Sequence, residues 1–305
     1  MISFLKLIRF PNLVIIALTQ VLIRYGLIMP AFITEFHQTH IFPTHLSKTG
    51  FLMLVLSSLL VAAAGYIIND VHDVSIDEVN KPGKNLIGKK YSEQFAKKLF
   101  YWFSGIAIAI GFYLALAIQK NVMGFIQVFA VVSLYMYSSS FKKRLFIGNL
   151  IIALLAALAV AIVGLYEPSI YLNIEFVLYY AAFAFIVTLT REIIKDIEDF
   201  DGDELAQRKT IPIVFGVKIA KTIIISLIII TLAGLMYLLW KYFYMNKVTS
   251  FINLIGMFLI PFLALSYLVI TAHEKKDYYY ASLFTKAIMV YGLLSIIPFW
   301  YYFLR

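Results

Sequence analysis

The 305-residue sequence contains no cysteine and few charged residues. The lack of cysteine excludes disulfides, thiolate nucleophiles and Cys-ligated metal sites. Charged residues make up 14% of the chain, hydrophobic residues make up 62%, and the mean hydropathy is +0.87. Soluble domains are about half apolar and about a quarter charged. The composition therefore predicts an integral membrane protein whose mass lies mostly within the bilayer.

Long apolar runs follow one another along the chain. Each run is close to the roughly 20 residues that a helix needs to cross about 30 Å of hydrocarbon. Backbone groups in lipid must pair internally, which favours helices for such runs. The sequence predicts an all-α bundle of nine transmembrane helices in one domain, residues 1–305. The runs lie at about 11–32, 51–71, 99–118, 122–141, 147–166, 174–195, 220–243, 251–272 and 282–303.

Basic residues gather on one predicted side of the membrane. Most of the 26 Lys and Arg residues precede the first run or follow the second, fourth, sixth and eighth runs, and Lys286 is counted in the last group. The positive-inside rule then places the N-terminus in the cytoplasm and the C-terminus outside. Because the basic residues flank membrane spans and form no single patch, nucleic-acid binding is not expected.

An acidic stretch, residues 69–77, ends the second apolar run. Asn69, Asp73 and Asp77 have helical spacing i, i+4 and i+8, and Asp70 lies on a flanking row. Three carboxylates this close repel one another unless a cation lies between them. Oxygen ligands without cysteine favour Mg²⁺ over zinc. The alternative interpretation is a solvated loop that only ends a membrane helix.

A second acidic stretch, residues 191–203, ends the sixth run. Asp196, Asp199 and Asp203 have the spacing i, i+3 and i+7, and Arg191 and Lys195 precede them. Ionisable residues that enter a membrane helix are functional by default. Both stretches are predicted at the cytoplasmic face, four helices apart, which indicates a duplicated four-helix unit. Facing carboxylate sets with nearby cations suit Mg²⁺ ions and a diphosphate, and the apolar interior suits a hydrocarbon tail.

With these residues the sequence resembles the UbiA superfamily of intramembrane prenyltransferases. The motifs are N-D-x-x-D-x-x-x-D at 69–77 and D-x-x-x-D at 199–203, with shorter agreements at 9–12, 142–149 and 209–216. Residues 191–203 are most similar to the branch that makes the second ether bond of archaeal-type lipids. One departure is Lys84-Asn85, where many members have Arg-Pro, and lysine lacks the bidentate fork of arginine.

The resemblance implies a role for each matched residue. Asn69, Asp70, Asp73 and Asp77 would hold one Mg²⁺, and Asp196, Asp199 and Asp203 another. Lys84, Lys142, Arg191 and Lys195 would bind the diphosphate, and Asn12 and Tyr137 would line the substrate pocket. The residues expected to be catalytic are Asp73, Asp77, Lys195 and Asp199.

The expected activity is Mg²⁺-dependent transfer of a polyprenyl group, a geranylgeranyl group in this branch, from its diphosphate to the hydroxyl of a prenylglyceryl phosphate. One alternative keeps this chemistry and prenylates an aromatic acceptor, as in quinone or haem biosynthesis. A more distant alternative is a cation-coupled transporter, but transporters usually place ion sites near the membrane midplane. We expect a multi-pass protein of the cell membrane, with its active site facing the cytoplasm and no obligatory protein partner.

Overall fold

The computed structural model of the chain describes residues 2–29, 46–167, 174–243 and 248–299. Within these ranges the elements are helices, and an isolated bridge joins Ile87 to Tyr91. The α-helices are α1 (Ile2–Leu7), α2 (Phe10–Leu22), α4 (Lys48–His72), α5 (Val74–Asn80), α6 (Glu93–Ala117), α7 (Phe125–Ser139), α8 (Ile147–Leu165), α9 (Ile174–Glu198), α10 (Phe200–Leu205), α11 (Ile211–Phe215), α12 (Val217–Phe243), α13 (Val248–Thr271), α14 (Lys275–Leu294) and α15 (Ile296–Phe299). The π-helix η1 (Ile23–Ile28) extends α2, and the 3₁₀ turns are η2 (Asn121–Gly124) and η3 (Phe141–Lys143).

The predicted all-α membrane bundle is confirmed. In the described residues, eight helices are long and apolar enough to cross a membrane. The run predicted at 251–272 corresponds to α13, in which Gly256–Thr271 is a shorter apolar helix. The far ends of the runs predicted at 11–32 and 282–303 lie partly outside the described residues. Lys286, counted above with the loop residues, instead lies inside α14.

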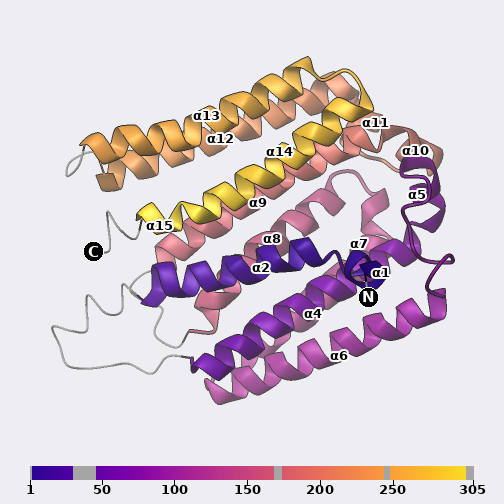
Figure 1. Cartoon of the computed structure of the whole chain (residues 1–305), viewed down its shortest axis with the longest axis horizontal. Helices are drawn as coiled ribbons and strands as arrows, with labels where there is room; N and C mark the ends of the chain where they lie inside the picture. The colour runs from indigo at the N-terminus through magenta and orange to yellow at the C-terminus, as the bar shows by residue number, and fades with distance from the viewer. Residues whose placement is uncertain (1, 30–45, 168–173, 244–247, 300–305) are drawn as a thin grey trace.

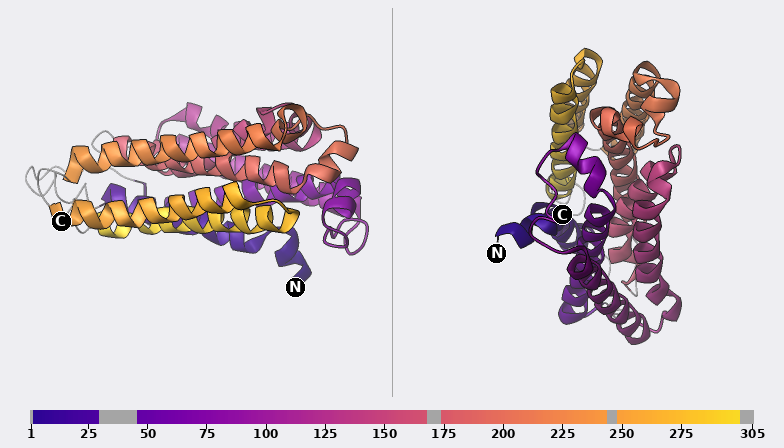
Figure 2. Two further views of the ribbon diagram at one scale, coloured as in Figure 1. Left: turned by 90° about the horizontal axis from the view of Figure 1, so that it is seen from above. Right: turned by 90° about the vertical axis from the view of Figure 1, so that its right-hand side faces the viewer.

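The long helices run side by side along one axis (Figures 1 and 2). Three apolar cores fill the space between them. One core includes Ile67 and Phe100 on α4 and α6, a second includes Ile193 and Ile224 on α9 and α12, and a third surrounds Phe51. Because lipid tails are as apolar as these side chains, close packing rather than exclusion from water holds membrane helices together.

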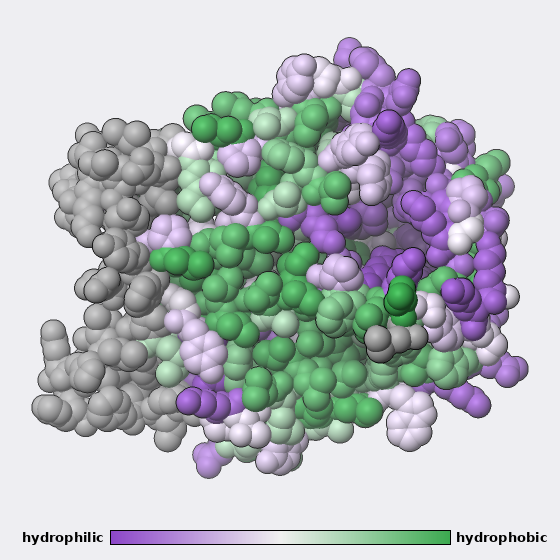
Figure 3. Space-filling view, in the orientation of Figure 1, coloured by the Kyte–Doolittle hydropathy of each residue, from purple (hydrophilic) through white to green (hydrophobic). Residues whose placement is uncertain are grey.

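Polar residues collect at one end of the bundle. Figure 3 shows hydrophilic side chains gathered at the end where Figure 1 places α5, α10 and α11, and hydrophobic side chains over the helices beside it. The connections that follow α4, α7, α9 and α13 also meet at this end (Figure 1). The two acidic stretches therefore share one face of the bundle, as the sequence predicts.

Both acidic stretches break the helix that carries them. α4 ends at His72, Asp73 has φ −101° and ψ 7°, and α5 follows. α9 ends at Glu198, Asp199 has φ −94° and ψ 13°, and α10 follows. The expectation of one continuous helical stack is wrong at these two positions. Each short helix begins directly at the break, because Asp77 N donates to Asp73 O at 2.8 Å and Asp203 N donates to Asp199 O at 3.1 Å.

Candidate active site

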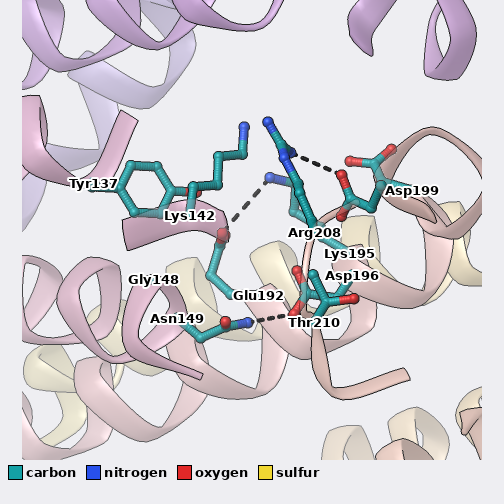
Figure 4. Close-up of a pocket in the computed structure, with 11 residues that line it drawn as sticks. Tyr137, Lys142, Gly148, Asn149, Glu192, Lys195, Asp196, Asp199, Arg208 and Thr210 are labelled. Carbon is teal, nitrogen blue, oxygen red and sulfur yellow. Dashed lines mark hydrogen bonds and ion pairs between the residues drawn. The ribbon is translucent and has the colours of Figure 1, made fainter. Parts of the chain in front are cut away.

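A polar pocket lies beside the second acidic stretch at this end of the bundle, and two of its lining residues, Lys142 and Arg208, pair with Asp73 of the first stretch. It has a volume of about 420 Å³, its open mouth included. α7, α8, α9, the η3 turn, α10 and the loop after α10 all contribute side chains (Figure 4). Cations and carboxylates alternate around it, so an anionic ligand and a metal ion both find partners here. The lining residues are Tyr137, Lys142, Gly148, Asn149, Glu192, Lys195, Asp196, Asp199, Asp203, Arg208 and Thr210.

Asp73 is the most heavily paired carboxylate of the first stretch. Its side chain is 4% exposed and forms ion pairs with Lys142 and, at 2.6 Å, with Arg208. Asn69 Nδ2 donates to Asp73 Oδ2 at 2.9 Å, and Lys142 Nζ donates to Asn69 Oδ1 at 3.3 Å. Burial opposes ionisation of Asp73, but the charges and hydrogen bonds of Lys142 and Arg208 outweigh it and hold the pKa below its ordinary value.

Arg208 joins the two acidic stretches. Its guanidinium donates to Asp73 at 2.6 Å and to Asp203 at 2.8 Å, and its side chain is 5% exposed. Nothing in the sequence selects Arg208, because it lies in a basic segment that membrane topology alone explains. Only the fold shows that the loop after α10 returns this side chain to the acidic motifs. A bridging arginine of this kind fixes the separation of the two carboxylates.

The second stretch presents its acidic residues to the same pocket. Asn149 Nδ2 donates to Asp196 at 2.8 Å, and Glu192 lies 3.8 Å from Lys195 (Figure 4). Lys81 Nζ pairs with Asp199 Oδ2 at 3.1 Å, while Asp199 Oδ1 is buried without a hydrogen-bond partner in the structure. The sequence pattern assigned no role to Asn149, Glu192 or Lys81, although Asn149 and Glu192 lie within the matched segments 142–149 and 191–203.

The other predicted residues differ in where the structure places them. Tyr137 lines the pocket, and Lys142 Nζ lies 5.8 Å from the centre of its ring. Lys84, which was expected at the diphosphate, is exposed. Lys81, three residues earlier, is the residue of this segment that pairs with Asp199. Three other predicted residues have partners outside the pocket lining: Asp70 pairs with Arg9 at 2.7 Å, Asp77 accepts from Asn85 at 2.9 Å, and Asn12 accepts from Lys286.

Asn80 couples the two short helices that follow the acidic breaks. Its Oδ1 accepts from Gly202 N at 3.1 Å, and its Nδ2 donates to Asp199 O at 3.2 Å. A Cβ atom on Gly202 would lie 2.4 Å from Asn80 Nδ2, so glycine permits this approach. The end of α5 is thus hydrogen-bonded to the start of α10, and the two motifs are positioned as one unit.

The donor chemistry of this site fits Mg²⁺. The acidic residues supply oxygen ligands from two stretches, and Asp199 Oδ1, which is buried and has no hydrogen-bond partner among the described residues, can bind a cation. Within the described ranges, no three acidic or histidine side chains form a ready-made metal cluster. Instead, Lys142, Arg208 and Lys81 lie against the carboxylates.

The family follows from comparison with known proteins. The profile of the UbiA prenyltransferase family matches residues 29–287, and this chain belongs to that family. Two similar relatives are digeranylgeranylglyceryl phosphate synthases. The protein from Methanosphaera stadtmanae is 32% identical over 247 residues, 79% of this chain and 86% of its own. The protein from Saccharolobus solfataricus is 34% identical over 236 residues, 75% of this chain and 76% of its own.

Solved structures support the fold. A structure described as giving insights into digeranylgeranylglyceryl phosphate synthase in membranes has a TM-score of 0.66 and 23% identity, covering 97% of this chain and 96% of its own. A UbiA homologue from Archaeoglobus fulgidus, bound to GPP and Mg²⁺, has a TM-score of 0.61 and 17% identity, covering 97% and 99%. This chain is therefore a membrane prenyltransferase with the UbiA fold, and the sequence-based assignment to that superfamily is confirmed.

Proposed function

We propose that this protein transfers a geranylgeranyl group from its diphosphate to the hydroxyl of a prenylglyceryl phosphate, forming an ether lipid and releasing diphosphate. The observation that carries the proposal is the pocket lined by Lys142, Lys195, Asp203 and Arg208, in which Arg208 also joins Asp203 to Asp73 of the first stretch. The names of the relatives support the substrate pair. The Archaeoglobus fulgidus homologue, which binds GPP with Mg²⁺, supports the cofactor.

The pocket supplies the charges that an allylic diphosphate needs in order to leave. Asn69, Asp73, Asp77, Asp196, Asp199 and Asp203 would hold Mg²⁺, which neutralises the diphosphate and makes it a better leaving group when bound. Lys142 and Lys195 would bind the remaining phosphate oxygens, and Glu192 orients Lys195. The ring of Tyr137 faces the pocket and would stabilise positive charge on the prenyl carbon.

The structure also suggests how the reaction is kept from water. Apolar cores pack around Ile67 and Ile193 on the two helices that end in the acidic motifs, α4 and α9. A low-water environment protects a cationic prenyl group from hydrolysis until the acceptor hydroxyl attacks. The carbon–oxygen bond to diphosphate breaks, the ether bond forms, and the hydroxyl proton passes to the departing diphosphate.

The acceptor is tested with purified protein, Mg²⁺ and labelled geranylgeranyl diphosphate. Geranylgeranylglyceryl phosphate and an aromatic acceptor, 4-hydroxybenzoate, are supplied in separate and competing reactions. We expect label in the diether lipid, with one diphosphate released per ether formed and no turnover in EDTA. Label in the aromatic product would assign the protein to the alternative prenylation, and absence of transfer to both would contradict the proposal.

We also propose that the pocket faces the cytoplasm. The support is the concentration of Lys and Arg in the connections at the pocket end of the bundle, together with the positive-inside rule. Because the chain has no cysteine, single introduced cysteines report sidedness directly. In intact cells an impermeant thiol reagent should label Lys48→Cys, at the opposite end of α4, and leave Lys90→Cys unlabelled. The reverse pattern would invert the orientation.

A further inference from the structure

Three cationic side chains lie beside the polar pocket without lining it. Arg9 precedes α2, Arg191 is on α9 and Lys286 is within α14. Lys286 Nζ donates to Asn12 Oδ1, and Asn12 N donates to Arg9 O at 2.8 Å, so Lys286 lies next to the residues that begin α2. α14 packs against both α9 and α2, which brings these distant parts of the sequence together. We call Arg9, Arg191 and Lys286 the basic cluster.

The basic cluster carries more positive charge than its neighbours neutralise. Arg9 pairs with Asp70 at 2.7 Å, and Arg191 pairs with Glu192 at 3.0 Å. Glu192 is shared, because Lys195 lies 3.8 Å from its other oxygen. Lys286 donates to the amide oxygen of Asn12, and among the described residues no carboxylate lies within 4 Å of its ammonium group.

The unfavourable free energy of an unpaired cation inside a membrane helix indicates that the basic cluster binds a ligand. A lysine inside a membrane helix is expensive unless it is paired or faces a polar substrate path. Lys286 is only partly buried. Arg191 Nε is buried and has no hydrogen-bond partner in the structure. An arginine and a lysine with spare donors are the groups that recognise a phosphate.

Neighbouring residues at the ends of α4 and α9 turn either toward the basic cluster or toward the pocket. At the end of α4, Asp73 is paired with the pocket residue Lys142, whereas Asp70 pairs with Arg9. On α9, Glu192 and Lys195 line the pocket, whereas Arg191 does not. The acidic motifs thus have an acid-rich side, suited to metal and diphosphate, and a side where, among the described residues, the three cations outnumber the two acids that pair with them, Asp70 and Glu192.

We propose that the basic cluster binds the phosphomonoester of the acceptor lipid. This inference rests on the proposed function, in which both substrates are anionic. A diphosphate with Mg²⁺ matches the acid-rich pocket, whereas a phosphomonoester that binds without metal matches Arg9, Arg191 and Lys286. Glu192 borders both sites, so a glycerol held by its phosphate would present its hydroxyl toward the prenyl donor. Arg191, expected from the sequence at the diphosphate, is reassigned to the acceptor.

The test compares Lys286→Met with wild type in steady-state transfer assays. We expect the KM for geranylgeranylglyceryl phosphate to rise about tenfold or more, as for the loss of a charged hydrogen bond, with the KM for the prenyl diphosphate unchanged. Lys286→Arg should restore most of the affinity. Lys276→Met, an exposed lysine on the same helix, is the matched control and should leave both KM values unchanged.

A binding measurement separates this inference from the proposed function. Without Mg²⁺ or prenyl donor, geranylgeranylglyceryl phosphate should raise the Tm of wild-type protein in detergent, whereas geranylgeranylglycerol should not, and Lys286→Met should abolish the shift. A phosphate-dependent shift that survives in Lys286→Met would overturn the inference, as would a rise in the KM of the prenyl diphosphate instead. Failure of the proposed function appears differently, as transfer to the aromatic acceptor or no transfer by wild-type protein.

Discussion

Asp73 and Asp199 occupy equivalent positions in the two acidic stretches. Each follows the end of a long membrane helix, has nearly the same φ and ψ angles, and precedes a short helix. Their partners differ. Asp73 is 4% exposed and is held by Lys142 and Arg208, whereas Asp199 is 18% exposed, pairs with Lys81 and leaves one oxygen unpartnered. The same backbone arrangement thus presents Asp73, whose charge is largely neutralised by its partners, and Asp199, which has one oxygen available to bind a cation.

This difference indicates that the first motif has a mainly structural role and that the second is more open to cation binding. The first motif is part of a buried ion-pair network that also determines where the second motif lies. The second motif offers an oxygen that a cation can bind without first displacing an arginine. Four predictions use this contrast, in order of expected effect.

The largest effect is expected on catalysis, and it should be similar for both motifs. Asp73→Asn and Asp199→Asn should each lower kcat by about 10³-fold, because each removes a charge that supports diphosphate departure. Transfer of labelled prenyl groups by purified variants measures this, with insertion checked by the yield of folded protein. Near-normal turnover in one variant would show that only one of the motifs serves the reaction.

Stability should separate the two variants. Asp73→Asn leaves two cations near a neutral amide, and breaking a buried ion pair costs about 3–5 kcal/mol. Asp199→Asn affects a pair with Lys81 that is partly exposed, for which about 1 kcal/mol is expected. Thermal unfolding in detergent without Mg²⁺ should therefore rank Asp73→Asn well below Asp199→Asn. Equal losses would contradict the contrast drawn from their partners.

The coupling of the motifs through Asn80 can be tested with a double-mutant cycle. Asn80→Ala removes two hydrogen bonds between α5 and α10 and should cost about 1–3 kcal/mol. Gly202→Ala forces its new Cβ against the Asn80 amide and should cost a similar amount. In the double variant the clash is relieved, so the two costs should not add. Additive losses of Tm would show that Asn80 does not couple the two helices.

The pH dependence of metal binding should follow the carboxylates whose pKa values are raised. Burial raises the pKa of Asp77, with a further contribution from the charge of Asp73, and burial also raises the pKa of Asp203 despite Arg208. Mg²⁺ needs the ionised forms. As the pH is lowered, the affinity for Mg²⁺ should fall by about tenfold per pH unit for each proton bound. This fall should begin at a higher pH than it would if both aspartates had the ordinary pKa of about 3.9.

The metal-free protein should respond in the opposite direction. Because the folded pKa values of Asp77 and Asp203 lie above their unfolded values, folding is favoured as pH falls through them. Asp73 has a depressed pKa, so its contribution to stability is lost only at lower pH, as pH falls through its folded value. Calorimetric Mg²⁺ titrations and unfolding scans from pH 4 to 8 measure both trends. Mg²⁺ affinity that is constant over this range would contradict the assignment of Asp77 and Asp203 as ligands.

Local patterns in the sequence were sufficient for the class of fold and the centre of the site. Apolar run length depends only on bilayer thickness, so the membrane helices follow directly from it. Asp196, Asp199 and Asp203 could be selected because acids at the end of an apolar run have no structural reason to be there, and the structure brings all three to one pocket.

Only the tertiary structure determines which basic side chains lie beside the acidic motifs. Arg208, Lys81 and Lys286 look like topology residues in the sequence, because a basic residue near a membrane end is expected for orientation alone. Arg208 and Lys81 pair with acids 135 and 118 positions away, Lys286 donates to the amide of Asn12 274 positions away, and helix packing determines these contacts. The sequence by itself therefore determined a membrane bundle with two acidic motifs at one face. The pairing of charges between those motifs was decided only when the helices packed, because electrostatic partners depend on distance in space and not on distance along the chain.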